Sequence, residues 1–278
     1  MGENFLYSLF SLFGKTAVIT GGSGTLGSTI AEGLGQAGAN IAVCYHHNKP
    51  TKLIRELNKK NIESKEYFVD VTNIKSMFKC RNMILKDFKK IDILINSAGG
   101  NIKEAITTKE KTFIDLPEWA LEDVIRLNLF GGAFLPTKVF APKMLENKNG
   151  GSIINIVSMN TYRPLLHRPG YAAAKAAVGN FTQWLATHFA LDCNNPMVRV
   201  NAIAPGFFLN KRNKFELINK EGVLTTRGKK IIENTPQGRF GDPKDLVGAC
   251  IWLSSEASNF VTGVIIPVDG GFQAFSGL

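Results

Sequence analysis

The sequence predicts one α/β domain, a doubly wound parallel sheet of about seven strands with helices on both faces. Short, wholly apolar segments alternate with helical patterns from one end of the chain to the other. Strands that are apolar at every position are typical of a parallel sheet covered on both faces. No internal repeat, low-complexity tract or linker divides the chain, so residues 1–278 are taken as a single domain.

Each predicted strand is short, apolar and bounded by turn residues or by a helical pattern. Helical segments of ten residues or more separate most of the strands, as helical crossovers between parallel strands require. In chain order the predicted strands are residues 16–20, 41–45, 67–69 (ending at Asp70), 91–95, 153–157, 198–203 and 264–268.

Two polar stretches interrupt the alternation of strands and helices. Residues 99–117 follow the fourth predicted strand, and residues 207–237 follow the sixth. In open α/β sheets the loops at the carboxyl ends of the strands build the ligand site. We therefore expect both stretches to form substrate-binding loops, the alternative being plain surface insertions.

The chain is basic, with a formal net charge of +10. Such a balance suits nucleic acid, anionic lipid or acidic small molecules as partners. The lysines are scattered through predicted helices, and no dense basic block is interleaved with aromatic residues. Solvated helix faces explain this pattern, so we expect no nucleic-acid partner, although a nucleic-acid binder on this fold is kept as an alternative.

The cysteines and the start of the chain bear on location. Cys44, Cys80, Cys193 and Cys250 are far apart, form no CxxC pair and have no neighbouring histidine at metal-ligand spacing. We expect free thiols, no metal site and a reducing compartment. The apolar residues 5–13 are too short to span a bilayer and lack a basic leader, so a cytoplasmic protein without a membrane partner is expected.

A glycine-rich segment, TGGSGTLG at residues 20–27, follows the first predicted strand. Glycines let the backbone turn tightly and approach a pyrophosphate, whose charge the following helix N-terminus favours. A strand–turn–helix unit is the context that a dinucleotide site requires. The segment therefore predicts a Rossmann-type fold, with Ser23 and Thr25 either binding phosphate or capping the helix.

Tyr171 and Lys175 are four residues apart and share one face of a predicted helix. A free tyrosine has a pKa of about 10, and a neighbouring ammonium favours the phenolate, which makes the side chain usable as an acid or base. Ser158 ends the fifth predicted strand, where its hydroxyl can reach a reacting carbonyl oxygen. This trio predicts an enzyme that interconverts an alcohol and a carbonyl.

Together these motifs resemble the short-chain dehydrogenase/reductase family over nearly the whole chain. Thr25 is a departure, because the family turn usually has a second glycine there, and a side chain at this position changes how closely the loop approaches the pyrophosphate. The matching segments are TGxxxGxG at residues 20–27, Asp70-Val71, NSAG at residues 96–99, Asn128, the Ser158/Tyr171/Lys175 trio, Pro205-Gly206 and DGG at residues 269–271.

The resemblance implies an NAD(P)-dependent oxidoreductase with defined residue roles. Tyr171 would be the general acid/base, Ser158 would polarise the carbonyl, and Lys175 would lower the pKa of Tyr171 and contact the nicotinamide ribose. Asn128 would support a proton-relay water, the alternative being a buried asparagine that bonds only to backbone. The implied cofactor-binding residues are Gly21, Ser23, Gly24, Thr25, Leu26, Tyr45, His46, Asp70, Val71, Asn96, Ala98, Gly99, Tyr171, Lys175, Pro205 and Gly206.

The choice between NAD and NADP depends on the end of the second predicted strand. NAD-preferring Rossmann proteins usually have a carboxylate there for the ribose 2′-hydroxyl. This chain has Tyr45, followed by His46 and His47. The absence of a carboxylate favours NADP(H) slightly over NAD, whereas Gly24, in a turn position that is often basic in NADP users, argues against it. Both histidines as exposed loop residues are the alternative.

Cationic residues surround the predicted catalytic trio. Arg163, His167 and Arg168 lie between the serine and the tyrosine, and Lys211 and Arg212 follow the Pro-Gly turn. Because arginine binds carboxylates bidentately, this cluster suits an anionic substrate. Exposure to solvent, or contact with cofactor phosphates, is the alternative for some of them.

Further stretches, at residues 98–101, 158–160, 179–184, 204–209 and 235–241, resemble the D-mannonate oxidoreductase (fructuronate reductase) branch of the family. The branch implies interconversion of D-fructuronate and D-mannonate, and the family implies a homotetramer. A gluconate 5-dehydrogenase-like enzyme, a 3-oxoacyl-carrier-protein reductase and a non-enzymatic dinucleotide sensor are the alternatives. The expected substrate-binding residues are Asn101, Asn160, Arg163, Arg168 and Phe208.

Overall fold

The computed structural model describes residues 5–193, 195–210 and 213–277. Its centre is a seven-stranded sheet in the order β3-β2-β1-β4-β5-β6-β7, and every neighbouring pair of strands is parallel. The predicted doubly wound sheet is therefore confirmed. The strands are β1 (Thr16–Thr20), β2 (Asn40–Tyr45), β3 (Ser64–Phe68), β4 (Ile93–Asn96), β5 (Gly151–Ile156), β6 (Val198–Pro205) and β7 (Ile265–Val268).

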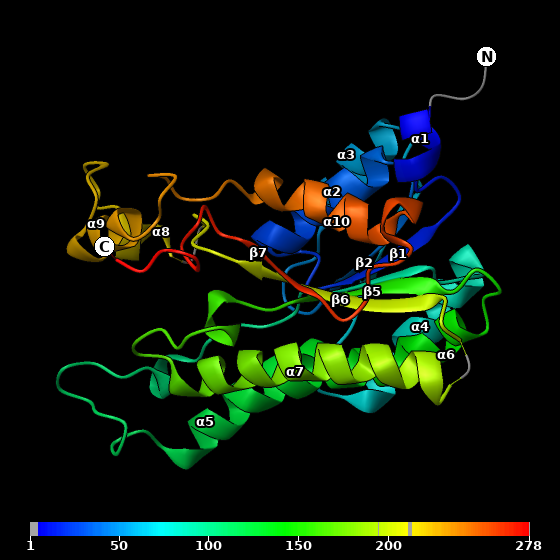
Figure 1. Ribbon diagram of the computed structural model, residues 1–278. Coiled ribbons are helices and arrows are strands. Elements are labelled where there is room, and N and C mark those ends of the chain that lie inside the picture. Colours follow the sequence, from blue (N-terminus) through cyan, green and yellow to red (C-terminus); the bar gives the residue numbers. More distant parts are fainter. Residues whose placement is uncertain (1–4, 194, 211–212, 278) are drawn as a thin grey trace.

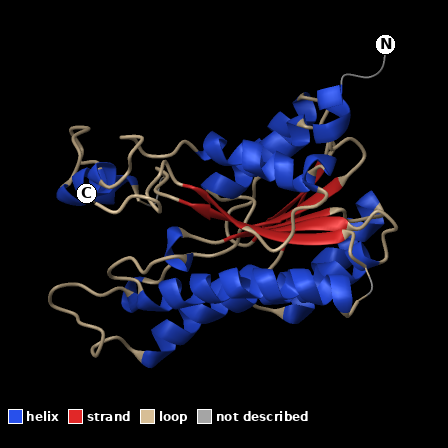
Figure 2. Ribbon diagram, viewed as in Figure 1, coloured by secondary structure: helices blue, strands red, loops and turns tan. Residues whose placement is uncertain are grey.

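Helices cover both faces of the sheet (Figures 1 and 2). One layer holds α1 (Phe5–Phe10), α2 (Thr25–Gln36), α3 (Thr51–Lys59) and α10 (Val247–Ser254). The opposite layer holds α4 (Ile74–Phe88), α5 (Glu118–Ile125), α6 (Leu135–Leu145) and the long α7 (Pro169–Leu191). A π-helical segment, η2 (Arg126–Phe134), joins α5 to α6.

The strand burial explains the apolar sequence pattern. Successive side chains of a strand point to opposite faces. Val18 of β1 packs into the core on the side of α4, α6 and α7, whereas Ala17 and Ile19 pack into the core on the side of α2 and α10. Both faces of β1 are thus withdrawn from water, so every position of this strand is buried.

The edge strand β3 departs from the predicted boundaries. We predicted residues 67–69, ending at Asp70, but the strand is Ser64–Phe68 and includes Lys65 and Glu66. An edge strand accepts charged side chains. In β3 Lys65 and Phe68 are exposed and Glu66 is half-buried, whereas Ser64 and Tyr67 are buried. At the N-terminus, α1 forms within an apolar stretch to which the sequence assigned no element.

Both predicted substrate loops lie at the edge of the sheet where the strands end (Figure 1). Residues 99–117 contain one short 3₁₀ turn, η1 (Lys103–Ala105). Residues 207–237 contain two short helices, α8 (Lys214–Leu217) and α9 (Thr226–Glu233), which pack together. Among the described helices, none has the length and apolar character that crossing a membrane requires.

Candidate functional site

The glycine-rich turn joins β1 to α2. Gly21 has a φ of 65°, and a Cβ there would lie 2.8 Å from the carbonyl oxygen of Ser97. A Cβ on Gly27 would lie 2.5 Å from the carbonyl oxygen of Gly21. Neither position accepts a side chain, because backbone atoms fill the space. The turn is therefore packed directly against the end of β4, as a dinucleotide-binding turn requires.

The N-terminus of α2 fits a pyrophosphate. Gly24 is the N-cap residue and makes no side-chain capping hydrogen bond, so the first-turn N–H groups face outward for an anionic ligand. Thr25, the residue that departs from the family pattern, is exposed on that first turn, and Ser23 is partly exposed. Leu26 packs against the core instead.

The ends of β2 and β3 meet where an adenosine would lie. Tyr45 packs edge-on against Phe68, with ring centres 6.1 Å apart, and His46 lies 5.6 Å from the same ring. Burial opposes ionisation of Asp70, but hydrogen bonds from Thr72 and the nearby charges of His46 and Arg126 hold the pKa of this carboxyl below its usual value. Val71, the next residue, is buried.

The end of β4 is held by buried polar side chains. Asn96 is buried, and its Nδ2 donates to Asn155 Oδ1 at 2.9 Å. Its Nδ2 is thus directed toward β5, while its Oδ1 is buried and has no hydrogen-bond partner among the described residues. Thr20 Oγ1 accepts from the N–H groups of Ser97 and Ala98 at 3.2 and 3.4 Å. Gly99, which follows, is exposed.

Asn128 lies in η2 and is fully buried. Its Nδ2 donates to the carbonyl oxygens of Gly100 and Val124 at 2.7 and 2.8 Å, and its Oδ1 accepts from the Gly100 N–H at 3.0 Å. The side chain is therefore fully engaged with backbone, as in the alternative that the sequence left open. A Cβ on Gly99 would lie 2.6 Å from Asn128 Oδ1 and 3.6 Å from Lys175 Nζ.

Tyr171 and Lys175 lie together on α7, as their spacing predicts. Lys175 Nζ lies 5.7 Å from the centre of the Tyr171 ring and donates to the carbonyl oxygen of Ile156 at 2.7 Å. Burial lowers the pKa of the Lys175 ammonium to about 8. The strand β5 therefore fixes the position of the ammonium beside the phenol.

The sequence predicts that Lys175 lowers the pKa of Tyr171, but in the structure the pKa of this phenol is raised. Burial raises the pKa of the phenol, while a hydrogen bond with Ser158 and the charge of Arg168 lower it in part, and the net shift is upward. A phenol that keeps its proton at neutral pH is suited to donate it. The spacing of Tyr171 and Lys175 shows the neighbouring ammonium but not the burial of the phenol, and burial opposes formation of the phenolate.

Ser158 is oriented by a residue whose role the sequence did not reveal. The Ser158 Oγ accepts from the backbone N–H and from the Nδ2 of Asn160 at 3.3 and 3.2 Å. Asn160 is itself buried, and its Oδ1 accepts from the Leu165 N–H at 2.8 Å. With both acceptor directions used, the Ser158 proton points to Tyr171 or to a bound oxygen. Asn160 thus orients the Ser158 hydroxyl through these two hydrogen bonds.

The turn after β6, which the family resemblance assigns to the nicotinamide side, packs against the DGG segment. A Cβ on Gly206 would lie 2.7 Å from Cα of Asp269, and its N–H donates to the carbonyl oxygen of Val268 at 2.9 Å. Pro205 is the last residue of β6 and is buried. Asp269 accepts from the Gly271 N–H at 2.9 Å, which shapes the DGG segment. The two sequence motifs therefore support each other.

The predicted substrate arginines have different environments. Arg163 is exposed, and its guanidinium donates to the carbonyl oxygens of Gln273 and Phe275 near the C-terminus. Arg168 lies near Tyr171 and forms an ion pair with Glu216 of α8 at 3.2 Å. Arg168 therefore lies close to Tyr171 with Glu216 as its ion-pair partner, whereas Arg163 is engaged with the C-terminal segment.

The other predicted substrate residues differ in their exposure to solvent. Asn101 is exposed in the loop after β4. Phe208 is 5% exposed and packs against Gly241, where a Cβ would lie 2.6 Å from its ring. Lys211 and Arg212 lie outside the described residues.

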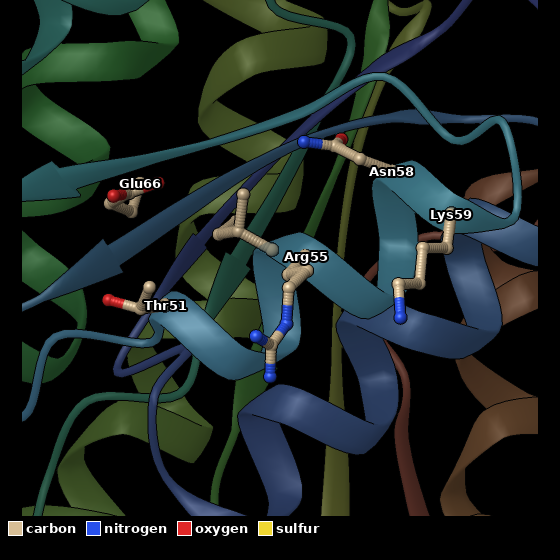
Figure 3. Close-up of a pocket in the computed structure, with 6 residues that line it drawn as sticks. Thr51, Arg55, Asn58, Lys59 and Glu66 are labelled. Atoms are coloured by element: carbon tan, nitrogen blue, oxygen red, sulfur yellow. The ribbon is translucent and has the colours of Figure 1, made fainter.

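Two cavities lie away from the serine and the tyrosine. One, of about 370 Å³, lies at the carboxyl ends of β6 and β7 and is lined in part by Phe208, Gln237 and Asp269. The other, of about 510 Å³, lies between α3 and β3 and contains none of the predicted site residues. Figure 3 shows the residues that line this second cavity, among them Arg55 and Lys59 on α3 and Glu66 on β3.

A parallel sheet with a glycine turn at its first strand, and a Ser–Tyr–Lys group beyond its fifth, defines a dinucleotide-dependent oxidoreductase. The sequence matches the protein family described as enoyl-(acyl carrier protein) reductase over residues 22–273. An uncharacterized oxidoreductase of Bacillus subtilis strain 168 is 43% identical over 278 residues, which cover 96% of this chain and 98% of the relative.

Two solved structures are similar over nearly their whole length. A provisional D-mannonate oxidoreductase from Haemophilus influenzae, with bound NAD, is 42% identical with a TM-score of 0.90, and the match covers 99% of this chain and 100% of that one. A gluconate 5-dehydrogenase from Burkholderia cenocepacia, in complex with NADP and tartrate, is 28% identical with a TM-score of 0.84, and the match covers 97% and 99%. The chain belongs to the short-chain dehydrogenase/reductase family and is an NAD(P)-dependent oxidoreductase.

Proposed function

We propose that the protein interconverts a sugar-acid alcohol with its ketone, and that the pair is D-mannonate and D-fructuronate. The observation that carries the proposal is the position of Arg168, the N-cap residue of α7, which precedes Tyr171 on the same element. Its charge lowers the pKa of the Tyr171 phenol in part, against the larger effect of burial. A guanidinium near the reacting group can pair with a carboxylate on the same small molecule. The sugar-acid enzymes among the similar structures support this substrate class.

A dinucleotide, when bound at the glycine turn, would supply the hydride for reduction and accept it in oxidation. As the carbonyl carbon is reduced, Tyr171 donates its phenolic proton to the developing alkoxide. The Ser158 hydroxyl donates a hydrogen bond to the same oxygen, and this type of support is worth about 3–4 kcal/mol. Lys175, fixed by Ile156, stabilises the phenolate that remains. Asn128 positions the loop at Gly100 beside them.

For the cofactor, we propose that both NAD and NADP are accepted, with a slight preference for NADP(H). Tyr45 and His46 lie at the end of β2, where an NAD-selective carboxylate would repel a 2′-phosphate. His46 is exposed and packs on His47, with ring centres 4.1 Å apart. The bound NAD and NADP of the similar structures are consistent with a site that admits either.

We also propose a cytoplasmic homotetramer. Trp184 of α7 is 54% exposed and Phe130 of η2 is 43% exposed. Trp184 stacks between Phe181 and His188, which makes a continuous aromatic surface on this helix layer. Exposed apolar surface of this kind favours association between copies. The four cysteines are free thiols, as expected in a reducing compartment.

A panel of carbonyl substrates tests the proposed function. NADPH and NADH oxidation is followed with D-fructuronate, 5-keto-D-gluconate and an acetoacetyl thioester. We expect D-fructuronate to give the highest kcat/KM and the thioester the lowest. Turnover of 5-keto-D-gluconate alone would make the protein a gluconate 5-dehydrogenase-like enzyme. Turnover of the thioester alone would favour a carrier-protein reductase and would overturn the sugar-acid proposal.

A further inference from the structure

Three charged side chains from separate elements meet beside the site. Arg168 is the N-cap residue of α7, Glu216 belongs to α8, and Arg227 lies in the first turn of α9. Glu216 Oε2 lies 3.2 Å from Nη2 of Arg168 and 3.9 Å from Nη1 of Arg227. One carboxylate oxygen therefore serves two guanidinium groups. We refer to these three residues as the arginine–glutamate cluster.

The cluster lies within electrostatic reach of the reacting oxygen. The charge of Arg168 lowers the pKa of the Tyr171 phenol in part, against the larger effect of burial. Burial and the charge of Arg168 both lower the pKa of Arg227, while Glu216 raises it. The two arginines are therefore close enough to repel each other, and Glu216, which lies within 4 Å of both, opposes this repulsion.

Arg168 also has an unused hydrogen-bond donor. Its Nε is buried and, within the described part of the chain, has no hydrogen-bond partner. A buried donor without an acceptor costs about 1–3 kcal/mol, more when the group is charged. The Arg168 side chain as a whole is 22% exposed, so a small ligand can reach other parts of the side chain although Nε itself is withdrawn from solvent. Glu216 therefore leaves the hydrogen-bonding capacity of this guanidinium only partly used.

The loops around Arg168 hold it at the site. His167, the preceding residue, has a φ of 75°, an uncommon conformation for a residue with a Cβ. Its carbonyl oxygen accepts from the Thr107 N–H at 3.0 Å, and its Nδ1 lies 3.2 Å from Thr107 Oγ1. The loop after β4 is thereby attached to the segment that carries Arg168.

We propose that Arg168 and Arg227 together receive the carboxylate of the substrate, and that Glu216 competes with it for both guanidinium groups. Two guanidinium groups and one carboxylate leave the cluster with a single positive charge, which one substrate carboxylate neutralises. Arg227 is then a specificity-determining residue, and Glu216 sets the affinity for acids. This inference rests on the proposed sugar-acid function.

The alternative is that the cluster only fastens α8 and α9 to α7. In that case the loss of any member would loosen the pocket, and acidic and neutral substrates would be affected alike. D-Fructose provides the comparison, because it has the carbon chain of D-fructuronate with a hydroxymethyl group in place of the carboxylate. The ratio of KM values for these two ketones therefore isolates recognition of the carboxylate.

The test measures kcat and KM with both ketones for wild type, Arg227→Ala, Arg227→Lys and Glu216→Gln. We expect Arg227→Ala to raise KM for D-fructuronate about tenfold or more, far more than for D-fructose, and Arg227→Lys to give an intermediate value. Glu216→Gln should lower KM for D-fructuronate about two- to fivefold. Lys229→Ala and Glu233→Gln, which change the same charges elsewhere on α9, should leave the KM ratio unchanged.

Each outcome decides one question. If wild type does not prefer D-fructuronate to D-fructose, the proposed function is overturned whatever the variants do. If wild type prefers D-fructuronate but Arg227→Ala raises KM equally for both ketones, the cluster only holds α8 and α9 against α7. The inference is then overturned. A rise in the D-fructuronate KM of Glu216→Gln would equally overturn it, because a competing carboxylate cannot aid binding when present.

Discussion

Lys175 Nζ lies 5.7 Å from the centre of the Tyr171 ring while it donates to the carbonyl oxygen of Ile156 at 2.7 Å. The ammonium is thus attached to the end of β5, and its distance from the phenol does not depend on a flexible side chain alone. Ser158 lies two residues beyond Ile156, so one strand positions both partners of the tyrosine.

Tyr171→Phe is the most direct test of the chemistry. The variant keeps the ring but loses the phenolic proton, so we expect kcat to fall about 10²–10⁴-fold. Dinucleotide binding, measured by quenching of protein fluorescence, should change little. Tyr162→Phe is a matched control, because the Tyr162 hydroxyl donates to the Ile265 carbonyl away from the reaction. Equal turnover in wild type and Tyr171→Phe would remove the tyrosine from the mechanism.

The two reaction directions should depend differently on pH. Because burial raises the pKa of Tyr171, the phenol is protonated at neutral pH and ready for ketone reduction. Alcohol oxidation needs the phenolate, which forms only as the pH rises. We expect kcat for D-mannonate oxidation to increase from pH 7 to pH 10, while kcat for reduction stays level near neutrality. The same profile for both directions would argue against a tyrosine acid/base.

Burial of Lys175 should lower the free energy of unfolding at neutral pH. In the unfolded chain its pKa is 10.5, whereas burial lowers it to about 8 in the folded protein. Between these pH values the unfolded chain binds more protons than the folded protein, so the free energy of unfolding rises with pH. Below about pH 8 the lysine is charged in both states, and its burial lowers the free energy of unfolding by the full amount. At pH 7 that penalty is about 3 kcal/mol.

Lys175→Met removes the penalty and also the hydrogen bond to Ile156, which is worth about 1 kcal/mol. We therefore expect the variant to be inactive yet more stable than wild type by about 2 kcal/mol at pH 7. The gain should shrink toward pH 10. Urea denaturation at both pH values measures it, and a variant less stable than wild type at pH 7 would show that the lysine is net stabilising.

Periodicity and apolar runs predicted the sheet well, because buried parallel strands have no polar face to obscure them. Residues 16–20 became β1 without change, and every other predicted strand overlaps an observed one. The misplaced boundary was that of β3, where the charged residues Lys65 and Glu66 belong to an edge strand. The helix α1 was also missed, since its side chains are exposed or only partly buried and form no amphipathic pattern.

The site could be predicted from the sequence where its residues share one helix or strand, because their spacing then fixes their relative positions. Tyr171 and Lys175 meet because they share one helix. The partners of Arg163, by contrast, lie near Gln273, more than a hundred residues away in the sequence. The pairing of Arg168 with Glu216 likewise depends on tertiary packing that no local pattern records.

Asn160 should act on the reaction through Ser158. Removal of the hydroxyl in Ser158→Ala should lower kcat about 10²–10³-fold. Asn160→Ala leaves the hydroxyl but frees its orientation, so we expect a smaller loss of about tenfold. In the double variant the asparagine change should add nothing, because the group it orients is gone. Steady-state kinetics of the four proteins measures this, and additive losses would instead make Asn160 an independent substrate contact.

His46→Asp should change the cofactor preference. His46 directly follows β2, is exposed and packs on Phe68, the last residue of β3. An aspartate at this position would face a ribose 2′-phosphate and repel it. We expect kcat/KM for NADPH to fall at least about tenfold, while NADH is used as well as before or better. His47→Asp places the same charge one residue further along, and its effect should be smaller. If NADPH were used equally well by wild type and His46→Asp, the end of β2 would not be where the 2′-position is recognised, and the preference would have to come from the glycine turn.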